Sequence, residues 1–264
     1  MTPRSKRPRG KKAILPEDSR SYLLPALDTA FLMSDSMRGM RFLLEYQKAE
    51  EILRHWGVRS TIVVFGSARA RANGPARQRH WYAEARKFGR IASERGGAKD
   101  HNGGKRDNVI ATGGGPGLME AANRGAREAG APTIGFNIRL PHEQRPNRYT
   151  TPALTFQFHY FAMRKMHFAM RANALVVFPG GFGTMDELFE LLTLSQTRKT
   201  RPIPIVLFDE AYWREIINFD AMAAAGTIVR SELKLFSFAD SAEDAWAALV
   251  RRGLKRGKTA IREL

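Results

Sequence analysis

The sequence contains no cysteine among its 264 residues. Disulfide bonds, thiolate nucleophiles and cysteine-ligated metals are therefore excluded. Long apolar runs are also missing, because none approaches the roughly 18 residues that a membrane-spanning helix needs. The apolar stretch Ala13-Ile14-Leu15 before Pro16 is too short for the core of a signal peptide. We therefore expect a cytoplasmic protein with no membrane partner.

Acidic residues are scarce relative to basic ones, with 26 Asp and Glu against 43 Lys and Arg and a net charge of +17. Residues 1–12 carry +6 and residues 251–264 carry +5, which leaves +6 of the +17 for the body. We expect both ends to be mobile tails. Two interpretations remain open for these tails. They are solubilising segments, or they attract nucleic acid or another polyanion weakly and without sequence specificity.

The most informative motif is the glycine turn Pro-Gly-Gly-Phe-Gly-Thr at 179–184. It follows the apolar run 174–178 and precedes the largely apolar stretch 188–192, an order typical of strand, turn and helix. Glycines let the backbone approach a ligand closely, and the amides at a helix N-terminus favour an anion such as phosphate. We therefore expect four residues of this turn to bind phosphate: Gly180, Gly181, Gly183 and Thr184.

Two further glycine turns follow apolar runs. The run 109–112 leads into a turn with four glycines, and the run 61–65 leads into a weaker one. Three such turns after strands predict a parallel sheet with its ligand at the carboxyl ends of the strands. Glu120, just after the first of these turns, would contact ribose or base, or would be a solvated helix residue. The turns supply the remaining expected ligand contacts: Gly66, Ser67, Gly113, Gly114, Gly115 and Gly117.

The apolar patterns alternate between strand and helix, which implies an α/β fold with a parallel sheet covered by helices on both faces. The expected strands are 61–65, 109–112, 132–138, 174–178 and 203–208. The expected helices are 27–56, 80–95, 116–129, 159–172, 184–197, 210–224 and 240–251. This pattern divides the chain into a disordered basic tail (1–20), a helical extension (21–58), an α/β domain (59–251) and a basic C-terminal tail (252–264).

Two charged groups near the 179–184 turn are candidates for chemistry. Arg164, His167 and Arg171 share one face of the helix before that turn, at spacings of three and seven. A solvated basic face is the ordinary alternative, although the nearby turn favours a function for Arg164 and a structural role for His167. Glu187 would be a catalytic carboxylate, or the end of a capping box that begins at Thr184. The two roles can coexist.

Together these motifs resemble the Lonely Guy family of nucleoside 5′-monophosphate phosphoribohydrolases, often labelled lysine decarboxylase-like, in its longer bacterial form. The resemblance covers about residues 60 to 250. The residues that carry it are 113–120, Arg164-Lys165 and 179–184 with Glu187, and further matches are 134–138, 140–144 and 196–197.

The resemblance implies a Rossmann-like fold and hydrolysis of the N-glycosidic bond of a purine nucleoside 5′-monophosphate to free base and ribose 5-phosphate. It implies catalytic roles for Arg164 and Glu187, a substrate contact for Lys165, no metal or cofactor, and a homodimer or larger homo-oligomer. The chain departs from the small cytokinin-activating members at Asp186 and in its N-terminal extension. An AMP-like substrate is therefore expected in preference to a cytokinin riboside monophosphate.

Elementary chemistry agrees with that expectation. Cleavage of a ribosyl–base bond builds positive charge on the sugar, which a fixed carboxylate can stabilise while it activates water. The guanidinium of Arg164 could orient Glu187 or hold phosphate. The alternative is a Rossmann-like protein that binds a nucleotide, a cofactor or single-stranded DNA without catalysis, and the basic tails would suit the last of these. A carboxylate beside a phosphate site favours the enzyme.

Overall fold

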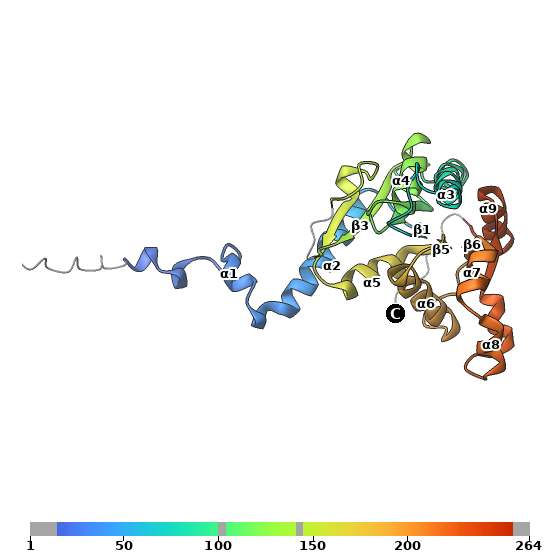
Figure 1. Cartoon of the computed structure of the whole chain (residues 1–264). Helices are drawn as coiled ribbons and strands as arrows, with labels where there is room; N and C mark the ends of the chain where they lie inside the picture. Colours follow the sequence, from blue (N-terminus) through green and yellow to red (C-terminus); the bar gives the residue numbers. More distant parts are fainter. Residues whose placement is uncertain (1–14, 100–103, 141–144, 256–264) are drawn as a thin grey trace, which may run out of the picture. The chain divides into compact units, whose positions relative to one another are not determined.

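A computed structural model of the chain describes residues 15–99, 104–140 and 145–255 (Figure 1). Most of the two predicted tails and most of the motif at 140–144 lie outside these residues. The chain divides into two compact units after Glu45. None of the helices in the described ranges combines the length and the hydropathy that are needed to cross a bilayer.

In its described part, residues 15–45, the first unit consists of short helical segments and the start of a longer helix. Helix α1 (Thr29–Leu32) begins where the Asp28 side chain accepts a 3.0 Å hydrogen bond from the Phe31 amide, and α2 (Arg38–His55) continues into the second unit. The prediction of helical structure from residue 27 to 56 is thus correct for its second half. It is wrong between α1 and α2, where the short polar segment around Ser34 breaks the helix.

The second unit contains a seven-stranded sheet in the order β4-β3-β2-β1-β5-β6-β7, and all of its strands are parallel. This confirms the predicted α/β fold with a Rossmann-like parallel sheet. The central strands are completely buried, as their continuous apolar runs predict. The strands are β1 (Thr61–Phe65), β2 (Val109–Thr112), β3 (Thr133–Ile138), β4 (Thr155–Phe158), β5 (Ala172–Val177), β6 (Ile205–Phe208) and β7 (Phe236–Ala239).

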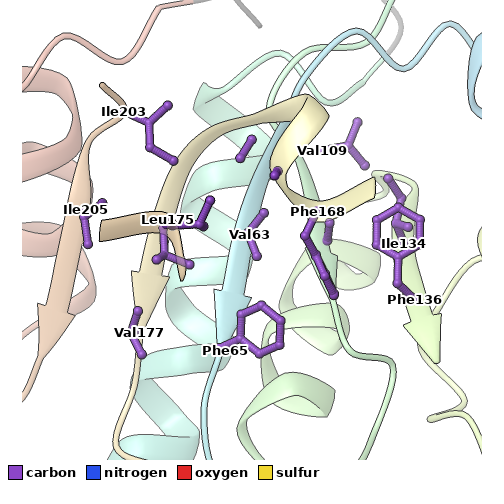
Figure 2. Close-up of a cluster of buried hydrophobic side chains, with 14 of the residues drawn as sticks. Val63, Phe65, Val109, Ile134, Phe136, Phe168, Leu175, Val177, Ile203 and Ile205 are labelled. Carbon is purple, nitrogen blue, oxygen red and sulfur yellow. The ribbon is translucent and has the colours of Figure 1, made fainter. Parts of the chain in front are cut away.

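Helices cover both faces of the sheet. Alternate residues of each strand point to opposite faces, so Ile62 and Val64 pack against α3 (Ala76–Arg95), α4 (Leu118–Glu128) and α9 (Ala242–Arg251). Val63 and Phe65 face the other way, in a second apolar cluster with Phe168 of α5 and Leu188 of α6. Figure 2 shows this second cluster, in which Phe65 lies near Phe168. The bounds of these two helices are α5 (Phe161–Arg171) and α6 (Phe182–Gln196).

Three elements depart from the sequence-based expectation. The strands β4 and β7 are not among the predicted strands; each has only four residues and lies at an edge of the sheet. The predicted helix 210–224 is two helices, α7 (Glu210–Ile216) and α8 (Phe219–Ala224). The break occurs at Asn218, whose side chain accepts a 2.9 Å hydrogen bond from the Ala221 amide and so begins a new helix.

Candidate active site

The three glycine turns meet at the carboxyl edge of the sheet, because β2, β1 and β5 are neighbours in the sheet. Their backbones are joined directly. The Ser67 amide donates to the Pro179 carbonyl at 2.9 Å, and the Ser67 carbonyl accepts from the Leu118 amide at 3.0 Å. The turn after β1 thus connects the other two into one rigid backbone surface.

Two glycines of the turn after β2 are required by close contacts. Gly117 has a φ of +76°, and a Cβ atom there would lie 2.2 Å from the Ser67 carbonyl oxygen. A side chain at Gly117 would therefore push apart the two joined turns. A Cβ at Gly113 would lie 2.7 Å from Nη2 of Arg164, so this glycine makes room for the arginine.

A cleft of about 720 Å³ opens beside these turns. Seven of the predicted site residues line it: Gly66, Ser67, Arg164, Gly180, Gly181, Gly183 and Thr184. The lining includes Met119 but none of the four predicted glycines between 113 and 117. Sequence reasoning missed the residues that complete the lining: Phe65, Ala68, Arg69, Trp81, Met119, Pro179, Phe182, Met185, Tyr212 and Ile216.

Glu187 is not part of a capping box. Helix α6 begins at Phe182 with Gly181 as its N-cap residue, and no side chain caps it. The amides of Thr184 and Met185 donate instead to the Gly181 carbonyl, at 2.9 and 3.0 Å. Thr184 lies within the first turn of this helix, in the space that a side chain at Gly180 would occupy. The capping interpretation of Glu187 is therefore wrong.

Arg164 and Glu187 form a buried pair. The Nη1 atom of Arg164 lies 4.0 Å from Oε1 of Glu187, and only 3% of the Glu187 side chain is exposed. The Nε atom of Arg164 donates to the Phe136 carbonyl at 2.8 Å, and its guanidinium carbon lies 5.3 Å from the centre of the Phe168 ring. These contacts fix the arginine between β3 and α5, with its Nη atoms directed toward Glu187 and Gly113.

Burial dominates the ionisation of this pair. Removal from water raises the pKa of Glu187 to about 7, although Arg164 and Lys165 act in the opposite direction. Removal from water also lowers the pKa of Arg164, which Glu187 only partly opposes. Both shifts disfavour charge, which is consistent with a separation too long for a direct hydrogen bond. A carboxyl group whose pKa lies near neutrality is suited to proton transfer.

The solvated basic face predicted as an alternative for Arg164, His167 and Arg171 is wrong, because all three side chains are buried. His167 stacks on Tyr46 with ring centres 5.5 Å apart, within a group of aromatic rings. Arg171 pairs with Glu50 of α2 at 2.6 Å. His167 and Arg171 thus hold α5 in place, consistent with a structural role for the histidine.

Two other predicted contacts lie away from the cleft. The Lys165 ammonium is 2.7 Å from Asp186 and 3.3 Å from Glu190, on the outer side of α5 and α6. Glu120 accepts a 3.0 Å hydrogen bond from the Tyr82 hydroxyl of α3. Neither of these side chains, nor that of Glu187, is among the residues that line the cleft in the described part of the chain. Within the same ranges, no group of three His, Asp or Glu side chains could hold a metal ion.

Solved structures support the fold. The structural-genomics target TM1055 superposes with a TM-score of 0.51 at 19% identity, over 73% of this chain and 99% of that protein. A molybdenum cofactor binding protein from the phototrophic bacterium Rippkaea orientalis gives a TM-score of 0.50 at 19% identity, over 75% of this chain and 99% of its own. At these identities the likeness concerns the fold alone.

Sequence comparisons point to the same family as the motifs. Two relatives, each 26% identical, are a "probable cytokinin riboside 5′-monophosphate phosphoribohydrolase" from Oryza sativa subsp. japonica, over 137 residues, and a cytokinin riboside 5′-monophosphate phosphoribohydrolase from Arabidopsis thaliana, over 144 residues. The matches span 51% and 53% of this chain and only 58% and 61% of those relatives. Residues 119–249 match the family described as "Possible lysine decarboxylase". These matches confirm the predicted resemblance to the lysine-decarboxylase-like family and its Lonely Guy members.

Proposed function

We propose that this chain hydrolyses the N-glycosidic bond of a purine nucleoside 5′-monophosphate and releases free base and ribose 5-phosphate. The observation that carries the proposal is Glu187, a buried carboxyl group that lies one helical turn beyond the glycine turn at 180–184 and has no capping role. The names of the relatives, which describe phosphoribohydrolases of nucleoside 5′-monophosphates, support the same class of reaction.

The proposed reaction uses groups at both ends of the glycine turn. The amides at the start of α6 would hold the 5′-phosphate, because they precede the first hydrogen bond within the helix and lie at its positive end. The sugar would then extend toward Glu187. The C1′–N bond breaks as positive charge builds on the sugar, a water oxygen bonds to C1′, and Glu187 accepts a proton from that water. The departing base takes up a proton from solvent, to which Glu187 then releases the proton that it accepted.

Arg164 has a separate part in this scheme. Its Nε is engaged by the Phe136 carbonyl, whereas Nη1 faces Glu187 at 4.0 Å. The arginine would therefore orient the carboxylate and favour its ionised form during the reaction. The Glu187 carboxyl group and Arg164 need no metal ion or cofactor for the steps assigned to them.

We propose AMP or a similar plain nucleotide as substrate in preference to a prenylated adenine nucleotide. The chain differs from the small cytokinin-activating proteins at Asp186, whose carboxylate accepts a 2.7 Å hydrogen bond from Lys165. We also propose that it works as a homodimer or a larger homo-oligomer, as the family resemblance implies.

The test is adenine release from AMP, followed by chromatography, for wild type and for Glu187→Gln. The amide is nearly isosteric with the carboxyl group but cannot accept the proton, so we expect at least a hundredfold loss of turnover. Adenosine serves as the control substrate, because it lacks the phosphate and should be cleaved far more slowly. Wild-type protein that binds AMP without releasing adenine would contradict hydrolysis and support the non-catalytic alternative.

A further inference from the structure

The cleft has a wall that the proposed reaction does not use. Trp81, Tyr212 and Ile216 line this wall. Tyr212 and Ile216 belong to α7, which follows β6 on one side of β5, whereas Arg164 bonds to β3 on the other side. The wall therefore flanks the glycine turn after β5 from the side opposite Arg164 and Glu187.

Asp209 organises this wall. It directly follows β6 and has a φ of +70°, a left-handed conformation that costs a non-glycine residue about 1–2 kcal/mol. Its carboxylate accepts hydrogen bonds from the Trp81 indole at 2.6 Å, from the Tyr212 amide at 2.9 Å, and from two nitrogens of Arg77 at 3.3 Å each. These donors hold the residue in its unfavourable conformation and join α3 to the start of α7.

Tyr212 connects this wall to the glycine turn after β5. Its ring meets that of Trp81 edge to face, with centres 5.6 Å apart, and its hydroxyl donates to the Gly180 carbonyl at 2.8 Å. In a trans peptide the carbonyl and the following N–H point in opposite directions. The hydrogen bond from Tyr212 therefore also sets the direction in which the Gly181 amide points.

The Gly180–Gly181 peptide depends on such a constraint more than its neighbours do. The Pro179 carbonyl is held by the Ser67 amide, and the Gly181 carbonyl by the first turn of α6. The peptide between them is flanked by two glycines, which tolerate a wide range of backbone angles. The Tyr212 hydroxyl is the partner of its carbonyl oxygen.

We propose that Tyr212 is a positioning residue, which orients the Gly181 amide so that the turn binds the phosphate of its ligand. Asp209 and Trp81 hold Tyr212 in place for this purpose. The inference rests on the proposed function for the identity of the ligand, but it concerns binding of phosphate and not cleavage. A residue that only docked α7 onto the sheet would affect ligands with and without phosphate equally.

Tyr212→Phe tests this role, because it removes the hydroxyl and keeps the ring. The measurement is calorimetric binding of ribose 5-phosphate, which hydrolysis cannot consume, and of adenosine, which has no phosphate. We expect the Kd for ribose 5-phosphate to rise about two- to tenfold, the effect of losing one hydrogen bond. The Kd for adenosine should stay within twofold, and in turnover of AMP the KM should rise more than kcat falls.

Tyr149→Phe is the matched control. It removes a hydroxyl that accepts a 3.1 Å hydrogen bond from Arg148 and does not line the cleft, so both dissociation constants should match wild type. An unchanged Kd for ribose 5-phosphate in Tyr212→Phe, or an equal loss for adenosine, would overturn the inference, as would wild-type protein that binds no ribose 5-phosphate. Wild-type protein that binds ribose 5-phosphate but never cleaves AMP would refute only the proposed hydrolysis.

Discussion

At the residue scale, burial determines how Glu187 ionises. An exposed glutamate is fully ionised at neutral pH, whereas burial raises the pKa of this one to about 7. The nearest cation, on Arg164, is fixed to the Phe136 carbonyl and reaches the carboxylate only at 4.0 Å. A closer ion pair would keep Glu187 permanently charged and make it a weaker base. The geometry therefore favours a group that can exchange a proton.

The raised pKa of Glu187 predicts how stability changes with pH. The folded protein holds this proton up to about pH 7, whereas the unfolded chain releases it near the ordinary value of 4.5. The contribution of Glu187 is thus most favourable below pH 4.5 and is lost as the pH rises through 7. Glu187→Gln removes this dependence. The Tm of the variant relative to wild type should therefore increase between pH 5 and pH 8.

Thermal melts of both proteins at several pH values provide the measurement. Glu190→Gln is a suitable control, because Glu190 lies on the same helix and is about one-third exposed. It loses an ion pair with Lys165 but not a buried carboxyl group, so its Tm difference from wild type should not show the increase expected for Glu187→Gln. A Glu187→Gln difference that does not vary with pH would show that the carboxyl group ionises normally in the folded protein.

At the scale of elements, the central part of the fold could be predicted because its signals are local. Strands β1, β2 and β5 are largely apolar runs, and each is followed within two residues by a glycine turn. The edge strands β4 and β7 have four residues each and depend on pairing with a neighbour, which no local pattern reveals. The break between α7 and α8 had a signal in Asn218, a residue that favours helix starts.

In the candidate site, too, only the features with a local sequence signal could be predicted. Arg164 and Glu187 stand out beside the glycine turn, but α6 starts two residues before Thr184, with Gly181 as its N-cap residue and no side-chain cap. The partner of Arg171 is Glu50, 121 positions away, and the partner of Tyr212 is a backbone carbonyl on another turn. Such pairings arise from the topology of the sheet and are not visible in a single sequence.

The contact between the turns after β1 and β2 predicts that Gly117→Ala destabilises the protein. In Gly117→Ala the new Cβ would meet the Ser67 carbonyl oxygen at 2.2 Å, and the residue would have to adopt a φ of +76°. We expect a loss of about 1–3 kcal/mol in the free energy of unfolding, measured by urea denaturation, together with weaker binding of ribose 5-phosphate. The reason is that Leu118 and Ser67 could no longer keep their hydrogen bond.

Gly39→Ala is the control for this prediction, since a Cβ at that position of α2 would have no atom within 4 Å. It should be neutral or stabilising by up to about 1 kcal/mol, because alanine favours a helix over glycine. Equal effects of the two substitutions would show that the turns after β1 and β2 do not depend on close contact.

For the whole molecule, the distribution of charge separates attraction to polyanions from nucleotide cleavage. The glycine turns, Arg164 and Glu187 all lie between residues 66 and 187, whereas residues 1–12 carry +6 of the net +17. An electrostatic attraction to polyanions weakens with salt and does not depend on a shaped pocket. Nucleotide cleavage depends on the pocket and should respond little to charge that is not part of it.

Deletion of residues 1–12 should therefore leave AMP hydrolysis within about twofold of wild type and reduce the salt concentration needed for elution from immobilised DNA. A full-length variant with the six Lys and Arg of residues 1–12 changed to Gln is the matched control, because it removes the charge and keeps the length. Both variants should elute early if charge is responsible. A truncated protein that is folded and assembled but no longer hydrolyses AMP would show that the tail belongs to the site, because loss of these charges alone leaves the buried carboxyl group of Glu187 on α6.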